Sequence, residues 1–344
     1  MKKKIGLVSL GCPKNLVDSE KMLASLKDNG YEIVADEKEA EIIIVNTCGF
    51  IESSKQESIN TILEMAENKK QSCELLIVTG CLAQRYKETI LEEIPEVDAV
   101  VGTGNYGEIA SVIKAAYGGG RPLLCTTPGD GLYQEDGKRI ISTGKSYAYL
   151  KIAEGCDNCC TYCVIPSLRG PYRSRRIEEI MDEAAFLAAS GIKEIILVAQ
   201  DTTRYGTDLY GERQLTKLIR KISELPGIEW IRLLYCYPEE IDDELINEIA
   251  NNDKVCKYID IPLQHASDSI LKRMGRRGDS KYIASLLEKL RSRINDLVIR
   301  TTFISGFPGE TEEDHSILVE FMKKYRFDRL GIFMYSKEED TPAA

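Results

Sequence analysis

Short apolar runs alternate with stretches of helical periodicity along nearly the whole chain, and this alternation limits the possible folds more than any other feature. In residues 1–120 the apolar runs are rich in β-branched residues and are short and continuous. Such runs, separated by helices, are typical of a doubly wound parallel sheet that helices cover on both faces. We expect strands at 4–10, 31–35 (an edge strand), 41–46, 74–80 and 98–102, and helices at 17–29, 53–69, 82–93 and 105–117.

The alternation resumes after residues 118–139, which are rich in glycine, proline and turn residues and are interpreted as a linker that can hold a hairpin. Six strand–helix units in a row then predict a barrel or partial barrel with its site at the C-terminal ends of the strands. Six strands fall short of a closed eight-stranded barrel, which leaves an opening for a large substrate. The expected strands are 147–153, 194–200, 230–236, 257–264, 298–306 and 329–336, and the expected helices are 176–190, 214–225, 241–251, 268–274, 279–294 and 311–325. The expected domains are 1–120, a linker at 121–142, and 143–344.

Composition narrows the classes of function. Eleven cysteines without a secretory signal indicate metal binding or redox chemistry in a reducing compartment rather than a disulfide framework. The start MKKKIGLVSLGC mimics a lipoprotein signal, but a strand explains it equally well, and we expect a cytoplasmic protein with no membrane span. The net charge of −10 disfavours a phosphate backbone and suits a basic protein partner. With two histidines in the chain, His-rich metal sites fit poorly.

Four cysteines crowd the segment EGCDNCCTYC, directly after the first strand of the second domain. As two C-x2-C knuckles they would form a zinc site, but adjacent Cys159 and Cys160 would then have to serve one tetrahedral ion. As C-x3-C-x2-C, Cys156, Cys160 and Cys163 would leave one corner of a metal group free, and a [4Fe–4S] cluster on three thiolates has such an open iron. This second interpretation is favoured, and it leaves Cys159 without a ligand role.

Three cysteines of the first domain share one position. Cys12, Cys48 and Cys81 each follow a predicted parallel strand, at the sheet edge where ligands collect in doubly wound folds. A flavodoxin-like strand order would make these strands neighbours and bring the three thiols together. They could then hold a second cluster. The remaining cysteines, Cys73, Cys125, Cys236 and Cys256, show no pattern and are interpreted as structural.

The segment CDNCCTYC resembles the C-x3-C-x-aromatic-C signature of radical S-adenosylmethionine (SAM) enzymes, whose fold is a partial (β/α)6 barrel. In that family the open iron binds SAM, and reductive cleavage yields a 5′-deoxyadenosyl radical. TFISGFPGET resembles the family's fifth-strand motif, although Thr302 replaces a glycine. A structural alternative for His265 is a capping group before the next helix. The resemblance implies SAM contacts from Tyr162, Gln200, Asp201, Gln264, His265 and Ile304.

GCPKNLVDSE, VNTCGFIE and TGCLAQR resemble the N-terminal domain of methylthiotransferases, where Cys12, Cys48 and Cys81 would bind an auxiliary [4Fe–4S] cluster. IPSLRGPYRSR and VAQDTTRYGTD resemble the group that modifies the β-carbon of an aspartate in small-subunit ribosomal protein twelve. This resemblance implies SAM as both methyl donor and radical source, a basic ribosomal-protein substrate, and an electron donor such as flavodoxin or ferredoxin.

Two alternatives stay open: a tRNA-adenosine methylthiotransferase, and a non-catalytic iron–sulfur protein for electron transfer or sensing. The basic run LRGPYRSRR either faces substrate or cofactor or is a solvated helix start. A C-terminal TRAM domain, which the family's full-length members carry, is expected to be absent from this chain.

Overall fold

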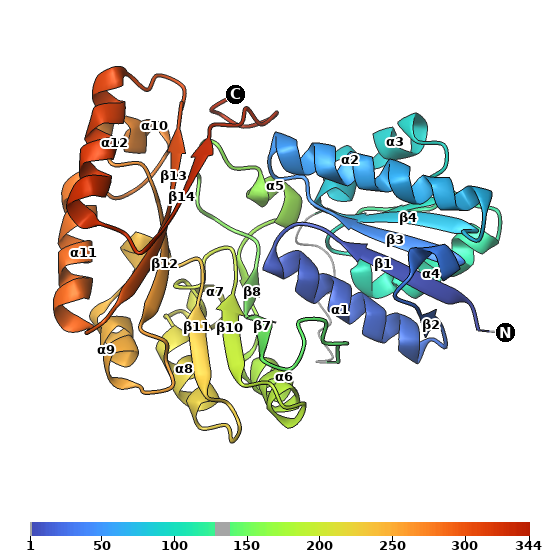
Figure 1. Cartoon of the computed structure of the whole chain (residues 1–344), viewed down its shortest axis with the longest axis horizontal. Coiled ribbons are helices and arrows are strands. Elements are labelled where there is room, and N and C mark those ends of the chain that lie inside the picture. The colour runs from blue at the N-terminus through green and yellow to red at the C-terminus, as the bar shows by residue number, and fades with distance from the viewer. Residues whose placement is uncertain (1, 128–137) are drawn as a thin grey trace. The chain divides into compact units, whose positions relative to one another are not determined.

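The computed structural model describes residues 2–127 and 138–344. Its contacts divide the chain into two compact units (Figure 1). The first unit contains Met1–Ser142 and Val164–Pro171, and the second contains Thr143–Cys163 and Tyr172–Ala344. In the described part of the chain, no helix combines the length and the apolar character needed to cross a lipid bilayer.

The first unit is built on one six-stranded sheet whose neighbouring strands are all parallel. Its order is β2-β1-β3-β4-β5-β6, which begins with the flavodoxin-like order and confirms the predicted doubly wound sheet. The three strands that precede the candidate cysteines are therefore neighbours. The strands are β1 (Lys4–Ser9), β2 (Glu32–Ile33), β3 (Ile42–Thr47), β4 (Leu75–Gly80), β5 (Ala99–Val101) and β6 (Leu123–Leu124).

Helices cover both faces of this sheet, α1 and α4 on one side and α2 and α3 on the other (Figure 1). Alternate residues of the central strands point to opposite faces, so Ile42 and Ile44 pack in one core and Ile43 and Val45 in the other. This two-sided burial explains why the strands are apolar throughout. The helices are α1 (Pro13–Asp28), α2 (Glu52–Ala66), α3 (Cys81–Glu93) and α4 (Ile109–Tyr117), with 3-10 turns at Glu37–Glu39, Glu67–Lys70 and Tyr106–Glu108.

The segment interpreted as a linker contributes to this sheet. Leu123–Leu124 form its last strand, paired in parallel with β5. Residues 128–137, where the expected hairpin would turn, lie outside the described residues.

The second unit contains six β/α strands that follow each other in sequence order, in two parallel groups β7-β10-β11 and β12-β13-β14. A bridge between Ile231 and Val255, and a hydrogen bond from Cys236 N to Asp260 O (2.8 Å), join the two groups. This is the predicted six-stranded partial barrel. The strands are β7 (Tyr147–Lys151), β10 (Glu194–Val198), β11 (Trp230–Leu233), β12 (Tyr258–Gln264), β13 (Val298–Ser305) and β14 (Arg329–Met334).

Three helices of this unit begin at side-chain caps. Asp242, Asp279 and Thr311 each accept a hydrogen bond from a backbone N–H in the first turn of the helix that follows, which stabilises each helix start. The helices are α6 (Ile177–Ala189), α7 (Thr207–Tyr210), α8 (Leu215–Ser223), α9 (Asp243–Asn251), α10 (Asp268–Arg273), α11 (Ser280–Arg293) and α12 (Glu312–Tyr325), with a 3-10 turn at Pro238–Glu240.

Three short elements around the cysteine-rich segment were not predicted from the sequence as separate elements. β8 (Ala153–Glu154) pairs antiparallel with β9 (Arg173–Ser174) and closes the loop that carries the cysteines. Inside that loop lies α5 (Ile165–Arg169), which belongs to the first unit. Two-residue strands and a one-turn helix have too little hydrophobic periodicity to be recognised from sequence.

Candidate metal centres

In the first unit, Cys12, Cys48 and Cys81 lie at the C-terminal ends of β1, β3 and β4. Gly11, with φ +89°, allows the turn before Cys12 to approach Cys48: a Cβ at Gly11 would lie 2.9 Å from Cys48 Cβ and 3.2 Å from its Sγ. Cys12 caps α1, and Cys81 is the first residue of α3. The sheet order thus brings together three thiols from distant parts of the sequence, two of them at helix N-termini.

The backbone around these thiols is fixed by buried polar side chains. Asn15 donates through Nδ2 to Leu10 O (3.1 Å) and to Thr47 O (2.9 Å), and so joins the ends of β1 and β3. Asn46 donates to Asn15 O (2.9 Å), and Ser58 both donates to Cys48 O and accepts from Cys48 N. The loops that carry Cys12 and Cys48 are therefore held by the ends of the neighbouring strands and by α2.

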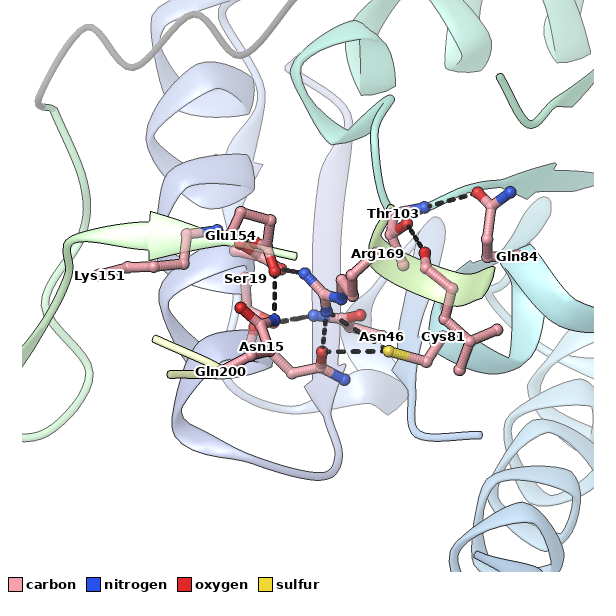
Figure 2. A network of polar contacts seen from close by, with 12 residues as sticks. Asn15, Ser19, Asn46, Cys81, Gln84, Thr103, Lys151, Glu154, Arg169 and Gln200 are labelled. Atoms are coloured by element: carbon pink, nitrogen blue, oxygen red, sulfur yellow. Dashed lines mark hydrogen bonds and ion pairs between the residues drawn. The ribbon is translucent and has the colours of Figure 1, made fainter. Parts of the chain in front are cut away.

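Arg169 completes this arrangement (Figure 2). Its side chain is buried, and it donates to Asp18 Oδ2 (2.7 Å), to Asn15 Oδ1 and to Cys81 Sγ (3.5 Å). Arg169 is the first basic residue of the run LRGPYRSRR. The sequence left two roles open for this run: contact with substrate or cofactor, or a solvated helix start. The structure excludes the solvated role for Arg169.

Burial raises the pKa of Cys48, and it raises the pKa of Cys81 to about 11. Arg169 acts in the opposite direction on both thiols, whereas Cys12 raises both values further. The thiols are thus close enough to influence one another electrostatically. Metal binding at such a site must release protons from the thiols.

In the second unit, the cysteine-rich loop leaves β8 and is held at several points. Asn158 N donates to Cys156 Sγ (3.4 Å), and Thr161 N donates to Met274 O (3.0 Å) at the end of α10. Cys160 Sγ lies 3.9 Å from the Tyr237 hydroxyl. Burial raises the pKa of Cys156 to about 11.

A second arginine stands beside this loop. Arg276 Nη1 lies 3.9 Å from Cys160 Sγ, its guanidinium stacks 3.9 Å from the centre of the Tyr237 ring, and its Nη2 donates to Pro262 O (3.0 Å). Each cysteine group therefore has one arginine within hydrogen-bonding reach of a sulfur atom.

Among the described residues, no group of three His, Cys, Asp or Glu side chains converges closely enough to hold one metal ion. In a [4Fe–4S] cluster each thiolate binds its own iron, so its ligands do not have to meet at one point. All eleven cysteines are free thiols.

Cys159 is exposed, whereas Cys156, Cys160 and Cys163 are half-buried, and its Sγ lies 3.7 Å from the nearby Asp157 O. We expect Cys159→Ser to keep the full iron and sulfide content of the reconstituted protein, because this side chain is exposed and lies outside the C-x3-C-x2-C spacing. Iron and sulfide analysis beside Cys160→Ser checks this. A loss of iron from Cys159→Ser would contradict this expectation and favour two C-x2-C knuckles, in which Cys159 is a metal ligand.

The structure brings two of the candidate SAM contacts together. Tyr162 and Ile304 pack against the same apolar cluster, which is built around Ile270, Met274 and Phe307. The rings of Tyr162 and Phe307 meet edge to face, with centroids 6.3 Å apart. Tyr162 directly precedes Cys163 in the sequence, so this apolar cluster includes the neighbour of a candidate metal ligand.

Gln200 and Asp201 differ in their availability to a ligand. Gln200 donates to Glu154, which also accepts from the buried Lys151 (2.9 Å; Figure 2), while Gln200 Oε1 is buried without a hydrogen-bond partner in the described structure. Both oxygens of Asp201 are engaged, by Thr203 (2.7 Å) and by Asn158 (3.1 Å). Gln200 therefore offers a free acceptor, whereas Asp201 holds the cysteine loop.

Gln264 is the last residue of β12, and His265 follows it. Gln264 has φ +75° at an irregularity of the strand. His265 is fully buried, its Nδ1 accepts from Ser267 N (3.0 Å), and its Nε2 points to Glu310 Oε1 at 3.6 Å. These contacts correspond to the capping alternative for His265, because Ser267 is the N-cap residue of α10.

We expect His265→Gln to make the protein less sensitive to mild acid. Burial lowers the pKa of His265 from 6.5, so between that value and the lower folded value the unfolded chain binds more protons than the folded chain. The stability given by the neutral ring is complete above the unfolded pKa and is lost as the pH falls toward the folded pKa. Melting temperatures at about pH 7.5 and about pH 5.5 should fall more for the wild type than for His265→Gln. His315→Gln is the control, and equal losses in wild type and His265→Gln would contradict the expectation.

Sequence reasoning missed the residues that orient the cysteines. Asn15 and Asp18 lie in the quoted GCPKNLVDSE motif, one helical turn apart, and this spacing was an available signal for a shared face of α1. Arg169 lay in the undecided basic run. Nothing in the sequence indicated a role for Arg276, because Cys160, which it contacts in the structure, is 116 residues away in the sequence.

Comparison with known proteins supports both halves of this description. Residues 4–102 match the "Uncharacterized protein family UPF0004", and residues 150–322 match the "Radical SAM superfamily". Among solved structures, the radical SAM methyltransferase TsrM from Kitasatospora setae has a TM-score of 0.72 at 16% identity and covers 100% of this chain and 77% of its own. The cobalamin-dependent enzyme OxsB has a TM-score of 0.62 at 16% identity over 99% of this chain and 54% of its own. These structures share the fold.

The curated relatives are much more similar in sequence. "Ribosomal protein uS12 methylthiotransferase RimO" from Acetivibrio thermocellus is 60% identical over 100% of this chain and 77% of the relative. The protein of the same name from Lachnoclostridium phytofermentans is 59% identical over 99% of this chain and 78% of the relative. Identity at this level over nearly the whole chain shows the family. The chain belongs to the RimO family of ribosomal protein uS12 methylthiotransferases, within the radical SAM superfamily.

Proposed function

We propose that this chain is a transferase that adds a methylthio group to the β-carbon of an aspartate in ribosomal protein uS12. The observation that carries the proposal is the pair of cysteine triplets. The first triplet stands at the C-terminal ends of three parallel strands, and the second lies in the loop that follows β8. Each triplet lies in its own compact unit, the first of which includes the α5 segment that carries Arg169, and each triplet has an arginine beside one of its sulfur atoms. The relatives named above carry this activity in their names.

Cys156, Cys160 and Cys163 would hold one [4Fe–4S] cluster and SAM. Three thiolates leave one iron open, and SAM bound there supplies, on one-electron reduction, the radical that removes a hydrogen atom from the substrate. The residues present fit this ligand: Gln200 Oε1 is a buried acceptor without a partner, suited to an ammonium group, and Tyr162 and Ile304 offer an apolar surface. Asp201 would hold Asn158 and the loop. Gln264 and His265 are the weaker candidates, because His265 already bonds its own turn.

Cys12, Cys48 and Cys81 would hold the auxiliary [4Fe–4S] cluster, whose open iron would present the sulfur that is transferred. Two SAM molecules would then be consumed for each product. One would give its methyl group to sulfur and leave as S-adenosylhomocysteine, and the other would leave as methionine and 5′-deoxyadenosine. In this proposal the first unit, Met1–Ser142 with Val164–Pro171, carries the auxiliary site, and the second unit carries the SAM site.

The substrate we propose is a basic ribosomal protein, which the net charge of −10 suits. A cytoplasmic electron donor such as flavodoxin or ferredoxin would supply the reducing equivalents. Both sites need reduced thiols before they can bind iron, which fits a reducing compartment.

The test offers the reconstituted, reduced protein two substrates under anaerobic conditions: ribosomal protein uS12 and a tRNA. Mass spectrometry should find methylthio-aspartate in uS12 and an unmodified tRNA. Modified tRNA with unmodified uS12 would overturn the choice of substrate in favour of the tRNA alternative. Absence of 5′-deoxyadenosine with both clusters present would indicate a non-catalytic electron-transfer or sensor protein.

A further inference from the structure

Arg169 is six positions beyond Cys163 in the sequence, yet it lies in the first unit beside Cys81. We propose that Arg169 is a positioning residue of the Cys12–Cys48–Cys81 site, whose guanidinium holds the Cys81 thiolate and sets the reduction potential of the auxiliary cluster. This inference rests on the proposed function, because it requires that a cluster binds there.

One guanidinium reaches the surroundings of all three cysteines. It donates directly to Cys81 Sγ (3.5 Å) and to Asn15 Oδ1. Asn15 in turn donates to Leu10 O, two residues before Cys12, and to Thr47 O, next to Cys48. A change at Arg169 therefore affects the sulfur atom of Cys81 directly and the other two cysteines through Asn15.

The arginine is held firmly in this place. Its ion pair with Asp18 (2.7 Å) is nearly inaccessible, with 3% and 4% of the two side chains exposed. Thr103 Oγ1 donates to Leu168 O (2.7 Å), and Val164 and Leu168 pack against Cys81. Figure 2 shows Arg169 directed toward Asn15 and Cys81.

The chemistry gives the contact a measurable effect. Hydrogen bonds to the sulfur atoms and the local net charge are two of the factors that set the potential of an iron–sulfur cluster. A reduced cluster carries one more negative charge, so a nearby N–H donor and cation stabilise it and raise the potential. Lysine would not reproduce this, since its ammonium is a point charge that lacks the planar fork reaching Asp18, Asn15 and Cys81 together.

The test removes the second cluster, so that one signal remains. In a chain with Cys156, Cys160 and Cys163 changed to alanine, the potential of the remaining cluster is measured by EPR-monitored titration beside iron and sulfide content. Two variants are compared in this background: Arg169→Lys, and the double variant Asp18→Leu with Arg169→Leu. The double variant removes a buried ion pair as a unit, which proteins often tolerate, whereas Arg169→Leu alone would leave a buried carboxylate unpaired.

The matched control is the double variant Glu20→Leu with Arg139→Leu, which removes another buried ion pair (3.4 Å), again between a carboxylate of α1 and an arginine outside that helix. We expect a more negative potential in both Arg169 variants and no shift in the control. If the double variant loses its iron while its circular dichroism is unchanged, the positioning role is also supported. If the double variant does not fold, the potential and iron content of Arg169→Lys decide whether the positioning role holds.

An unchanged potential and iron content in Arg169→Lys and in the double variant would overturn the inference. Failure of the proposed function gives a different result: the parent chain, with Arg169 intact, would then hold no cluster.

Discussion

A chain in which Cys156, Cys160 and Cys163 are all alanine is expected to form no 5′-deoxyadenosine from SAM and to keep about half of its iron. The reconstituted wild type should contain about eight irons, and the variant about four, because each cysteine triplet holds one four-iron cluster. Iron and sulfide analysis, with chromatography of the SAM products, measures both quantities. Retention of all the iron, or loss of all of it, would contradict the assignment of ligands.

The reciprocal variant, with Cys12, Cys48 and Cys81 changed to alanine, is the matched control. It should also keep about four irons but still cleave SAM to 5′-deoxyadenosine, without methylthio product. The pair of variants thus separates radical formation from sulfur transfer. If the reciprocal variant also stopped producing 5′-deoxyadenosine, the two sites would not have the separate roles proposed here.

The second large effect is expected from Gly80→Ala. Gly80 lies directly before Cys81, with φ +95° and ψ −156°, a backbone conformation almost confined to glycine. A Cβ there would lie 2.4 Å from Asn46 Oδ1 and 2.5 Å from Thr47 O, so the end of β3 or the turn before α3 must move. We expect a loss of about 3 kcal/mol or more in the free energy of unfolding, and loss of the iron held by Cys12, Cys48 and Cys81.

Gly30→Ala separates the effect of a positive φ from the effect of the steric clash at Gly80. Gly30 also has a positive φ, +88°, but a Cβ there would meet no atom within 4 Å. It should cost about 1 kcal/mol through backbone strain and leave the iron content unchanged. Chemical denaturation and iron analysis of both variants check the comparison. Equal iron contents in the two variants would show that the turn before Cys81 does not position a metal ligand.

The sequence predicted the elements that place the cysteines because their signals are local. Continuous apolar strands, helices between them and a cysteine after each strand were sufficient to predict that Cys12, Cys48 and Cys81 share one edge of a sheet. The sheet order β2-β1-β3-β4-β5-β6 confirms that β1, β3 and β4, the strands before these cysteines, are neighbours. The spacing of Cys156, Cys160 and Cys163 likewise matched a known signature.

The partners of these cysteines could not be predicted in the same way. Cys81 and Arg169 are 88 residues apart, and nothing in either local sequence indicates their contact. The same holds for Asp201 and Asn158, 43 residues apart, where a carboxylate expected to contact SAM holds the cysteine loop. Such contacts depend on how loops return to a sheet edge, and hydrophobic periodicity carries no information about that.

The assignment of Val164–Pro171 to the first unit has a consequence for dissecting this protein. The chain passes from one unit to the other at three places, after Ser142, Cys163 and Pro171, so no single cut separates the two folded bodies. A fragment ending at Ser142 would keep all six strands of its sheet but lack α5, and with it Val164, Leu168 and Arg169 around Cys81. The two units therefore cannot be exchanged as independent modules. The segment Val164–Pro171, which completes the first unit, begins directly after Cys163, an iron ligand proposed for the second unit.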